Sequence, residues 1–385
     1  MYSLLLAVIY LAFISLGLPD STLGSAWPTI YAEMNIPISY MGIVSFVISA
    51  GTILSVLLTD RAVEKLGTRW VTFISVMLTA VALFGFSTAT EFSHFLIFGV
   101  PYGLGAGAID AALNNYVALH YNSRHMSWLH CFWGVGTIIS PYIMTMALTN
   151  ATWNDGYRTI SFIQMGIALV ILLSFPIWKT KSSKTAEEIK VKPTPISEAV
   201  KINGVMPVLI GFMAYCAAEC TAMLWASSYF EGVFAVSKEE AASLGSLFFI
   251  GITTGRFLAG FITEKLGDSI LIFLGATIAT AGILLIALPV KAVAIVGFVV
   301  LGFGCAPIYP CIIHSTPIRF GEERSQSIIG IQMAAAYLGS MVMPSLFGII
   351  ANYINISLMP LYLGIFTVLM ILMIKQADKE TLTVK

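Results

Sequence analysis

Three acidic residues, Asp20, Asp110 and Glu219, lie inside long apolar stretches of a chain that is 58% hydrophobic and 10% charged. A carboxylate at the depth of a lipid bilayer costs about 2.5–3.5 kcal/mol on insertion scales, so it normally faces a cavity and has a function. Removal from water favours the neutral form of a carboxyl group, which lets it bind and release a proton. These residues are therefore our candidates for proton binding along a water-filled path.

Asp20 follows Pro19 within the segment Gly17–Ser25, which is rich in glycine and hydroxyl residues. Proline removes a backbone donor, and neighbouring hydroxyls can satisfy the backbone groups that it frees. The pattern predicts a broken helix that lines a cavity. The alternative is a buried acid that only bonds to Ser21 or Thr22.

Asp110 and Asn114 are four residues apart in a segment of small residues that begins at Gly103. In a helix this spacing places the carboxylate and the amide on one face, and the small residues allow a second helix to come close. The glycines are not a nucleotide-binding loop, because they lie inside an apolar helix. Both Asp20 and Glu219 are about 16 residues into their helices, which puts them near the middle of a bilayer.

Further polar and aromatic residues in the apolar segments suit recognition of a neutral polyol. Amides and carboxylates bond to hydroxyl groups, and aromatic faces pack on sugar C–H surfaces. The alternative for each is ordinary core packing, hydrogen bonding between helices or an interfacial aromatic belt. Together with Asp20, the predicted substrate-binding residues are Asn114, Asn115, His130, Trp133, Gln164, Trp225, Tyr309, Gln332 and Tyr337.

Twelve apolar runs of bilayer-spanning length must position these residues. The mean hydropathy of +0.88 is far above that of a soluble enzyme, and so few charges could not cover a soluble surface. We predict an all-α membrane protein of twelve transmembrane helices in two six-helix bundles, residues 1–178 and 203–385, joined by a polar cytoplasmic linker at 179–202. The runs are 4–30, 40–59, 69–89, 94–119, 128–149, 157–178, 203–230, 241–263, 270–288, 292–314, 325–350 and 356–374.

The basic residues predict the orientation. All of the 20 lysines and arginines except Arg158, Lys238, Lys291 and the intrahelical Arg256 fall on the side that also holds both termini. Because cytoplasmic loops are enriched in Lys and Arg, both termini are predicted to be cytoplasmic. The first run has no basic n-region and continues to about residue 30, so it is interpreted as an uncleaved first helix.

The two halves of the chain resemble each other at an offset near 200 residues. Gly51 and the loop Glu64-Lys-Leu-Gly67 match Gly251 and Glu264-Lys-Leu-Gly267. Two further pairs of segments match in the same order: Gly103-Leu-Gly with Gly302-Phe-Gly, and Gly136…Pro141 with Gly339…Pro344. A parallel duplication of this kind predicts a central site and rocking of two bundles around it.

The segment Asp60-Arg61-Ala-Val-Glu64-Lys65-Leu66-Gly67-Thr-Arg69, with its echo from Gly255-Arg256 to Gly267, resembles the loop motif of the major facilitator superfamily. The resemblance implies a cytoplasmic gate in which charged residues exchange partners as the bundles rock. The alternative is a plain cluster of charges that holds the loop inside. The predicted gate residues are Asp60, Arg61, Arg69, Arg256 and Glu264.

Within that superfamily the chain resembles the fucose–proton symporter family, which includes bacterial glucose/mannose permeases. The resemblance rests on the acid of the first helix, on the glycine-acid-asparagine pattern around Asp110, and on Leu129-His130-Cys-Phe-Trp133-Gly134. It implies sugar recognition by Asp20 and proton coupling by Asp110. The family commonly has Glu at the position of Asp110, and Asn115 stands where proline often follows.

We therefore predict a proton-coupled symporter of a hexose or deoxyhexose that works by alternating access in the bacterial cytoplasmic membrane. The alternative is a proton-coupled exporter of small amphipathic compounds. A receptor would need an appended cytoplasmic domain, for which the linker and tail are too short. An enzyme is not predicted, because no Ser/His/Asp order and no metal-like Cys/His spacing is present.

The expected partners are a small sugar and the lipid bilayer, with no nucleic acid, and the protein is expected to be a monomer. No cofactor or metal site is predicted. The coupling ion is a proton, with sodium as the alternative. Asp110, Asp20 and Glu219 are the predicted proton-coupling residues.

Overall fold

The computed structural model describes residues 2–37, 40–182, 194–236, 238–245 and 247–381. Helices make up nearly all of this part of the chain, and no strand occurs in it. The first eight helices are α1 (Tyr2–Asp20), α2 (Thr22–Glu33), α3 (Tyr40–Leu66), α4 (Thr68–Ser87), α5 (Phe92–His120), α6 (Ser123–Asn150), α7 (Trp153–Leu173) and α8 (Phe175–Ser182).

The second half repeats this helical plan after the short α9 (Ile196–Ala199). Its helices are α10 (Val205–Phe234), α11 (Lys238–Gly245), α12 (Leu247–Leu266), α13 (Asp268–Ile286), α14 (Lys291–Cys305), α15 (Ile308–His314), α16 (Thr316–Phe320), α17 (Glu322–Ile350) and α18 (Met359–Thr381), with a short π-helix at Ala351–Asn355 and a short 3-10 helix at Ile356–Leu358 between the last two.

The described residues contain eleven continuous stretches that are long and apolar enough to cross a membrane. The last one, Glu322–Thr381, has 60 residues. A helix of that length would measure about 90 Å, three times the thickness of a bilayer core. It therefore accounts for two crossings, α17 and α18, and the prediction of an all-α membrane protein with twelve crossing helices is confirmed.

The chain forms two compact units. One contains residues Met1–Tyr116 and Leu129–Pro193, and the other contains Val117–Trp128 and Thr194–Lys385. Helix α5 thus begins in the first unit and ends in the second, and helix α6 begins in the second unit and ends in the first. The predicted bundle and linker bounds stay predictions, and residues 183–193 of the linker lie outside the described residues.

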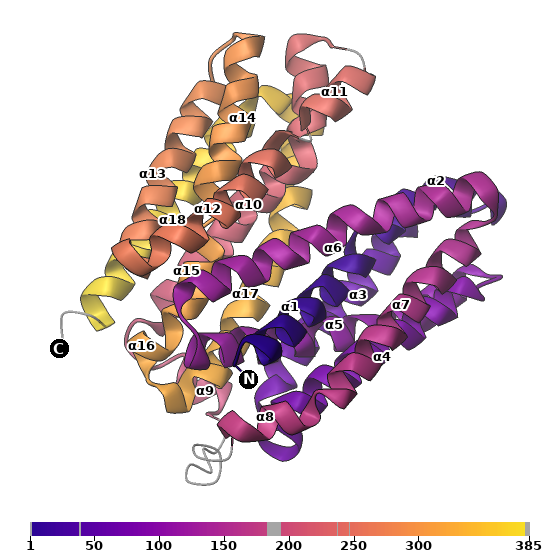
Figure 1. The fold of residues 1–385 in the computed structure, drawn as a ribbon. Coiled ribbons are helices and arrows are strands. Elements are labelled where there is room, and N and C mark those ends of the chain that lie inside the picture. Colours follow the sequence, from indigo (N-terminus) through magenta and orange to yellow (C-terminus); the bar gives the residue numbers. More distant parts are fainter. Residues whose placement is uncertain (1, 38–39, 183–193, 237, 246, 382–385) are drawn as a thin grey trace. The chain divides into compact units, whose positions relative to one another are not determined.

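In the first unit α4 packs against α7, and α1 packs against both (Figure 1). The glycines predicted from the repeat lie where helices approach each other closely. A Cβ atom added at Gly103 of α5 would collide with the backbone carbonyl of Ile48 in α3, and one at Gly136 of α6 would collide with that of Ile14 in α1. These contacts hold α5 and α6 against α3 and α1.

The second unit has the equivalent contacts. A Cβ atom at Gly302 of α14 would collide with the carbonyl of Phe248 in α12, and one at Gly339 of α17 would collide with that of Met213 in α10. Gly67 and Gly267 separate successive helices with nearly the same backbone angles, φ 77° and ψ 155° against φ 79° and ψ 161°. The sequence repeat therefore corresponds to a repeat in local structure.

The first crossing is interrupted at Ser21, directly after Pro19 and Asp20. The hydroxyl of Thr22 donates to the carbonyl oxygen of Pro19 across 2.6 Å, and that of Ser21 donates to the carbonyl of Thr137 in α6 across 2.6 Å. These hydroxyl groups thus bond to one backbone carbonyl at the break and to one in the neighbouring α6. The break places Asp20 at the end of a helix.

Candidate functional site

Asp20 is exposed although it lies inside the span Leu4–Trp27. Its Oδ2 accepts a hydrogen bond from the indole Nε1 of Trp133 in α6 across 2.8 Å, and its Oδ1 accepts from the hydroxyl of Tyr102 in α5 across 3.2 Å. Each carboxylate oxygen has further lone pairs for a ligand. Asp20 is therefore an accessible acceptor that two aromatic side chains hold in place.

Asp110 lies in a different environment, because it is only 5% exposed. The side-chain amide of Asn114 donates to Oδ1 of Asp110 across 2.8 Å and to its backbone oxygen across 2.9 Å. The Oδ1 atom of Asn114 lies 3.1 Å from Nε2 of His130 in α6. Because an amide oxygen only accepts, this nitrogen of His130 carries a proton. The chain of contacts joins α5 and α6 inside the first unit.

Asp20 and Asp110 thus offer two carboxyl groups with different surroundings in one unit. The exposed group can accept hydrogen bonds from a solute. The buried group is in contact with the amide of Asn114 and is only 5% exposed, so it leaves little room for a large ligand. The roles of Asp20 in sugar recognition and of Asp110 in proton coupling stay predictions.

The third acid, Glu219 of α10, is paired in the second unit. Its Oε1 lies 3.3 Å from NH2 of Arg256 in α12, and both residues are 6% exposed. The sequence predicted Arg256 as a residue of the cytoplasmic gate, and a charged side chain within a membrane helix normally has a partner. The structure identifies that partner as Glu219. The gate role of Arg256 stays a prediction.

The two glutamines of the predicted binding set lie between helices and are fully buried. Gln164 of α7 donates to the carbonyl of Ser15 across 2.7 Å and accepts from Thr79 across 2.6 Å. Gln332 of α17 accepts from Thr316 across 2.9 Å. Both glutamines therefore form hydrogen bonds between helices, which is the alternative to sugar binding that the sequence left open.

The remaining predicted binding residues are distributed over both units. In the second unit Trp225 donates to the carbonyl of Pro344 across 2.9 Å, and the ring of Tyr309 contacts that of Phe212 with 4.7 Å between centroids. Tyr337 is partly exposed on α17, and Asn115 is buried beside Asn114 in the first unit. Their roles in binding stay predictions.

Glu264, at the end of α12, is the predicted gate residue with the clearest partners. It accepts from Arg124 across 2.7 Å and from Asn122 across 3.2 Å. Both donors come from the segment Val117–Trp128. In the first unit the guanidinium of Arg69 lies 5.4 Å from the ring centroid of Phe175. Arg61 is exposed and Asp60 is partly exposed.

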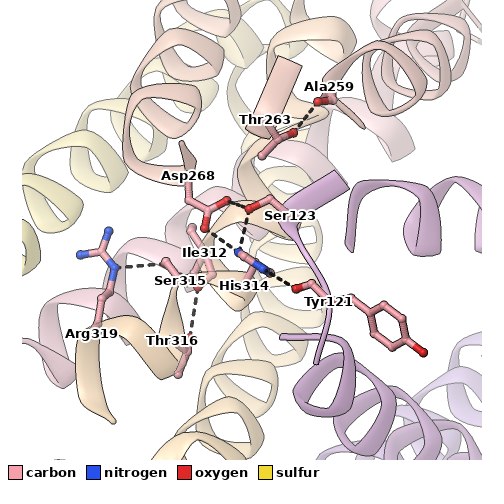
Figure 2. A network of polar contacts seen from close by, with 10 residues as sticks. All are labelled: Tyr121, Ser123, Ala259, Thr263, Asp268, Ile312, His314, Ser315, Thr316 and Arg319. Carbon is pink, nitrogen blue, oxygen red and sulfur yellow. Dashed lines mark hydrogen bonds and ion pairs between the residues drawn. The ribbon is translucent and has the colours of Figure 1, made fainter. Parts of the chain in front are cut away.

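A polar network around Ser123, which directly precedes Arg124 in the chain, was not predicted from the sequence (Figure 2). Ser123 donates to Oδ1 of Asp268 across 2.5 Å, and Nδ1 of His314 lies 2.7 Å from the Ser123 hydroxyl and 2.6 Å from Oδ2 of Asp268. Nε2 of His314 lies 3.1 Å from the backbone oxygen of Tyr121. The available sequence signal was weak, because Asp268 directly follows the repeated Glu-Lys-Leu-Gly loop but the other members lie far away in the chain.

Serine, histidine and aspartate occur together here without the geometry of a hydrolase. In a catalytic triad the serine and the aspartate contact opposite ring nitrogens, so that one nitrogen can take the serine proton. In this protein both Ser123 and Asp268 contact Nδ1, and the serine proton is directed at Asp268. The arrangement binds helices together and does not activate a nucleophile.

The model of the Major Facilitator Superfamily matches residues 9–229 and 207–383 of this chain. Among curated proteins, the chain is 21% identical to the glucose/mannose transporter GlcP of Bacillus subtilis, over 95% of this chain and 92% of that protein. It is 22% identical to Bypass of stop codon protein 6 of Saccharomyces cerevisiae, over 93% of this chain and 79% of that protein.

Two solved structures have the same fold. The proton:xylose symporter XylE superimposes with a TM-score of 0.79 at 14% identity, covering 96% of this chain and 94% of that one. The fucose:proton symporter FucP of E. coli gives a TM-score of 0.75 at 16% identity over 97% and 98% of the two chains. With the family model matched along nearly the whole sequence, this multi-pass membrane protein belongs to the Major Facilitator Superfamily and is a transporter, not an enzyme.

Proposed function

We propose that the protein is a proton-coupled symporter that carries a hexose or deoxyhexose by alternating access. The observation that carries the proposal is the exposed carboxylate of Asp20, which lies inside a membrane span between the indole of Trp133 and the phenol of Tyr102. A carboxylate accepts hydrogen bonds from sugar hydroxyls, and flat aromatic rings pack on sugar C–H surfaces. The likeness to GlcP, XylE and FucP supports the same substrate class.

The buried Asp110 supplies the coupling in this proposal. When Asp110 is charged, the low dielectric of its surroundings makes the change between the outward-facing and the inward-facing state of the transporter costly. Binding of a proton to Asp110 removes that cost. The Asn114–His130 pair gives the carboxyl group fixed polar contacts in the charged form. Sodium as coupling ion would need several oxygen atoms that converge on one point.

The location follows from the same proposal. The protein is placed in a bacterial cytoplasmic membrane as a monomer, with both termini in the cytoplasm. The excess of lysine and arginine in the segments on the side of the termini supports this orientation. Under this orientation an inward proton gradient drives uptake of the sugar.

The test is uptake by the purified protein in liposomes. Labelled glucose, mannose and fucose are supplied outside, with and without an inward proton gradient. Accumulation of one sugar that depends on the gradient supports the proposal, and replacement of the proton gradient by a sodium gradient distinguishes the two ions. If none of the sugars enters and a cationic dye is driven out under the same gradient, the proposal is wrong and the protein is an exporter.

A matched pair of variants locates the site. Asp20→Asn changes the exposed carboxylate, and Glu240→Gln changes an exposed acid that pairs with Lys291 on the surface across 2.9 Å. We expect Asp20→Asn to weaken sugar uptake and Glu240→Gln to leave it unchanged. Equal loss in both variants would contradict a specific role for Asp20.

A further inference from the structure

Both ring nitrogens of His314 face groups that accept hydrogen bonds. Nε2 lies 3.1 Å from the carbonyl oxygen of Tyr121, which cannot donate, so Nε2 carries a proton. The one proton of the Ser123 hydroxyl is directed at Asp268 across 2.5 Å, so the serine oxygen accepts from Nδ1. Oδ2 of Asp268, 2.6 Å from Nδ1, is satisfied by the same proton.

These contacts require one proton more than a neutral imidazole beside a carboxylate would hold. The count is the same whether that proton resides on Nδ1 of His314 or on Oδ2 of Asp268. Without it, a nitrogen lone pair and a carboxylate oxygen would face each other at 2.6 Å, which is repulsive. The network in Figure 2 is therefore complete only in its protonated form.

We propose that Tyr121, Ser123, Asp268 and His314 form a proton-dependent latch, in which His314 holds the segment Val117–Trp128, where α5 ends and α6 begins, against α13 and α15 only while the extra proton is bound. Tyr121 lies between α5 and α6, Ser123 begins α6, Asp268 begins α13, and His314 ends α15. An imidazole in water changes charge near pH 6.5, so the latch responds to pH in the physiological range.

The surroundings of the latch contain few other groups that could cause such a pH response. The thiol of Cys311, on α15, contacts Asp268, and the ring of His125 contacts that of Tyr121 with 5.6 Å between centroids. Arg124 and Glu264 form the neighbouring ion pair, and Arg319 is directed at Ser315 and Asp378. Among these residue types only histidine has an ordinary pKa near neutral pH, so His125 must be tested beside His314.

The latch has a consequence for transport because of its place in the chain. Residues Val117–Trp128 belong to the second unit. The rest of α5 and α6 belongs to the first unit and contains Asp110, Asn114 and His130. Any motion of one unit against the other must therefore bend these two helices or release the segment. This consequence rests on the proposed function, whereas the proton-dependent fastening does not.

The fastening can be measured without sugar or gradient by hydrogen–deuterium exchange of peptides from residues 117–128 in the purified protein. After correction for the intrinsic effect of pH on exchange, we expect opening of the segment to be about tenfold faster at about pH 8 than at about pH 6, as for the loss of one charge-assisted hydrogen bond. Failure of sugar uptake in liposomes would contradict the proposed function and leave this result standing.

Two variants of the latch and two control variants complete the test. His314→Gln can still donate one hydrogen bond but does not titrate, and Asp268→Asn removes the anion, so each is expected to abolish the pH difference. His94→Gln, in the first turn of α5 where the ring accepts from Thr90 and Glu91 at 3.2 and 3.3 Å, and His125→Gln are expected to retain it. No pH difference in the natural protein, or the full difference in both latch variants, would overturn the proposal.

Discussion

The amide of Asn114 donates a hydrogen bond of 2.8 Å to the buried carboxylate of Asp110, one turn earlier on α5. The same side chain contacts Nε2 of His130 in α6 across 3.1 Å, so the carboxyl group of Asp110 is linked to both helices. This relationship gives the buried acid a definite set of contacts. A change of side chain at Asp110 is therefore expected to affect contacts in both helices.

Asp110→Asn is expected to uncouple transport from the proton gradient. An amide of the same size cannot bind the proton, so the sugar should equilibrate and accumulation should fall to about the outside concentration, while exchange of labelled for unlabelled sugar continues. The measurement is uptake and counterflow in the same liposomes, with Glu240→Gln as control. Undiminished accumulation by Asp110→Asn would remove this residue from the coupling step.

Trp133→Phe is expected to weaken sugar binding. It keeps an aromatic ring in α6 but removes the 2.8 Å hydrogen bond to Asp20, and a bond to a charged group contributes about 1.5–3 kcal/mol. The apparent affinity should fall by roughly tenfold or more, with little change in the maximal rate. Trp70→Phe, on the exposed surface of α4, is the control for loss of an indole.

The Glu219–Arg256 pair should behave as a coupled unit in unfolding experiments. Removal of one partner of a buried ion pair leaves the other uncompensated and costs about 3–5 kcal/mol. We expect Glu219→Gln and Arg256→Gln each to lower the midpoint of thermal unfolding, and the double variant to lose less than the sum of the two. Strict additivity would show that the 3.3 Å contact contributes nothing to stability.

Gly103→Ala is expected to destabilise the first unit. The added methyl group would collide with the backbone of Ile48, and overpacking of a well-packed contact costs typically about 1–3 kcal/mol. Gly134→Ala is the matched control, since a Cβ atom there meets nothing within 4 Å. A difference in unfolding temperature between the two variants is the readout, and equal midpoints would contradict the close approach of α3 and α5.

The sequence was sufficient for the fold because bilayer-length apolar runs and a repeated glycine pattern are local signals. It also predicted that Asp110 and Asn114 share one helix face, which their hydrogen bond confirms. It correctly placed the helix break next to Asp20, since Pro19 and the following hydroxyl residues carry that information.

The partners of these residues could not be predicted in the same way. Trp133 and Tyr102 reach Asp20 from 113 and 82 residues away, and only the packing of α5 and α6 on α1 brings them there. For Gln164 the prediction from residue type was misleading. A glutamine suits a sugar site, but the amide of Gln164 lies buried between helices. The face that a side chain occupies depends on tertiary packing, which spacing within one helix does not contain.

Through His314, the latch would make the rate of sugar uptake depend on the pH of the compartment that receives the sugar. In a proton-coupled importer each transported sugar brings a proton into the cytoplasm, the side predicted for the gate residue Glu264, whose loop directly precedes Asp268 of the latch. In the proposed latch, acid completes the network and fastens the segment Val117–Trp128, so that motion between the two units must bend α5 and α6 instead of releasing the segment. Uptake would then slow as the receiving compartment acidifies and resume when its buffering recovers, which is negative feedback by a product of transport itself.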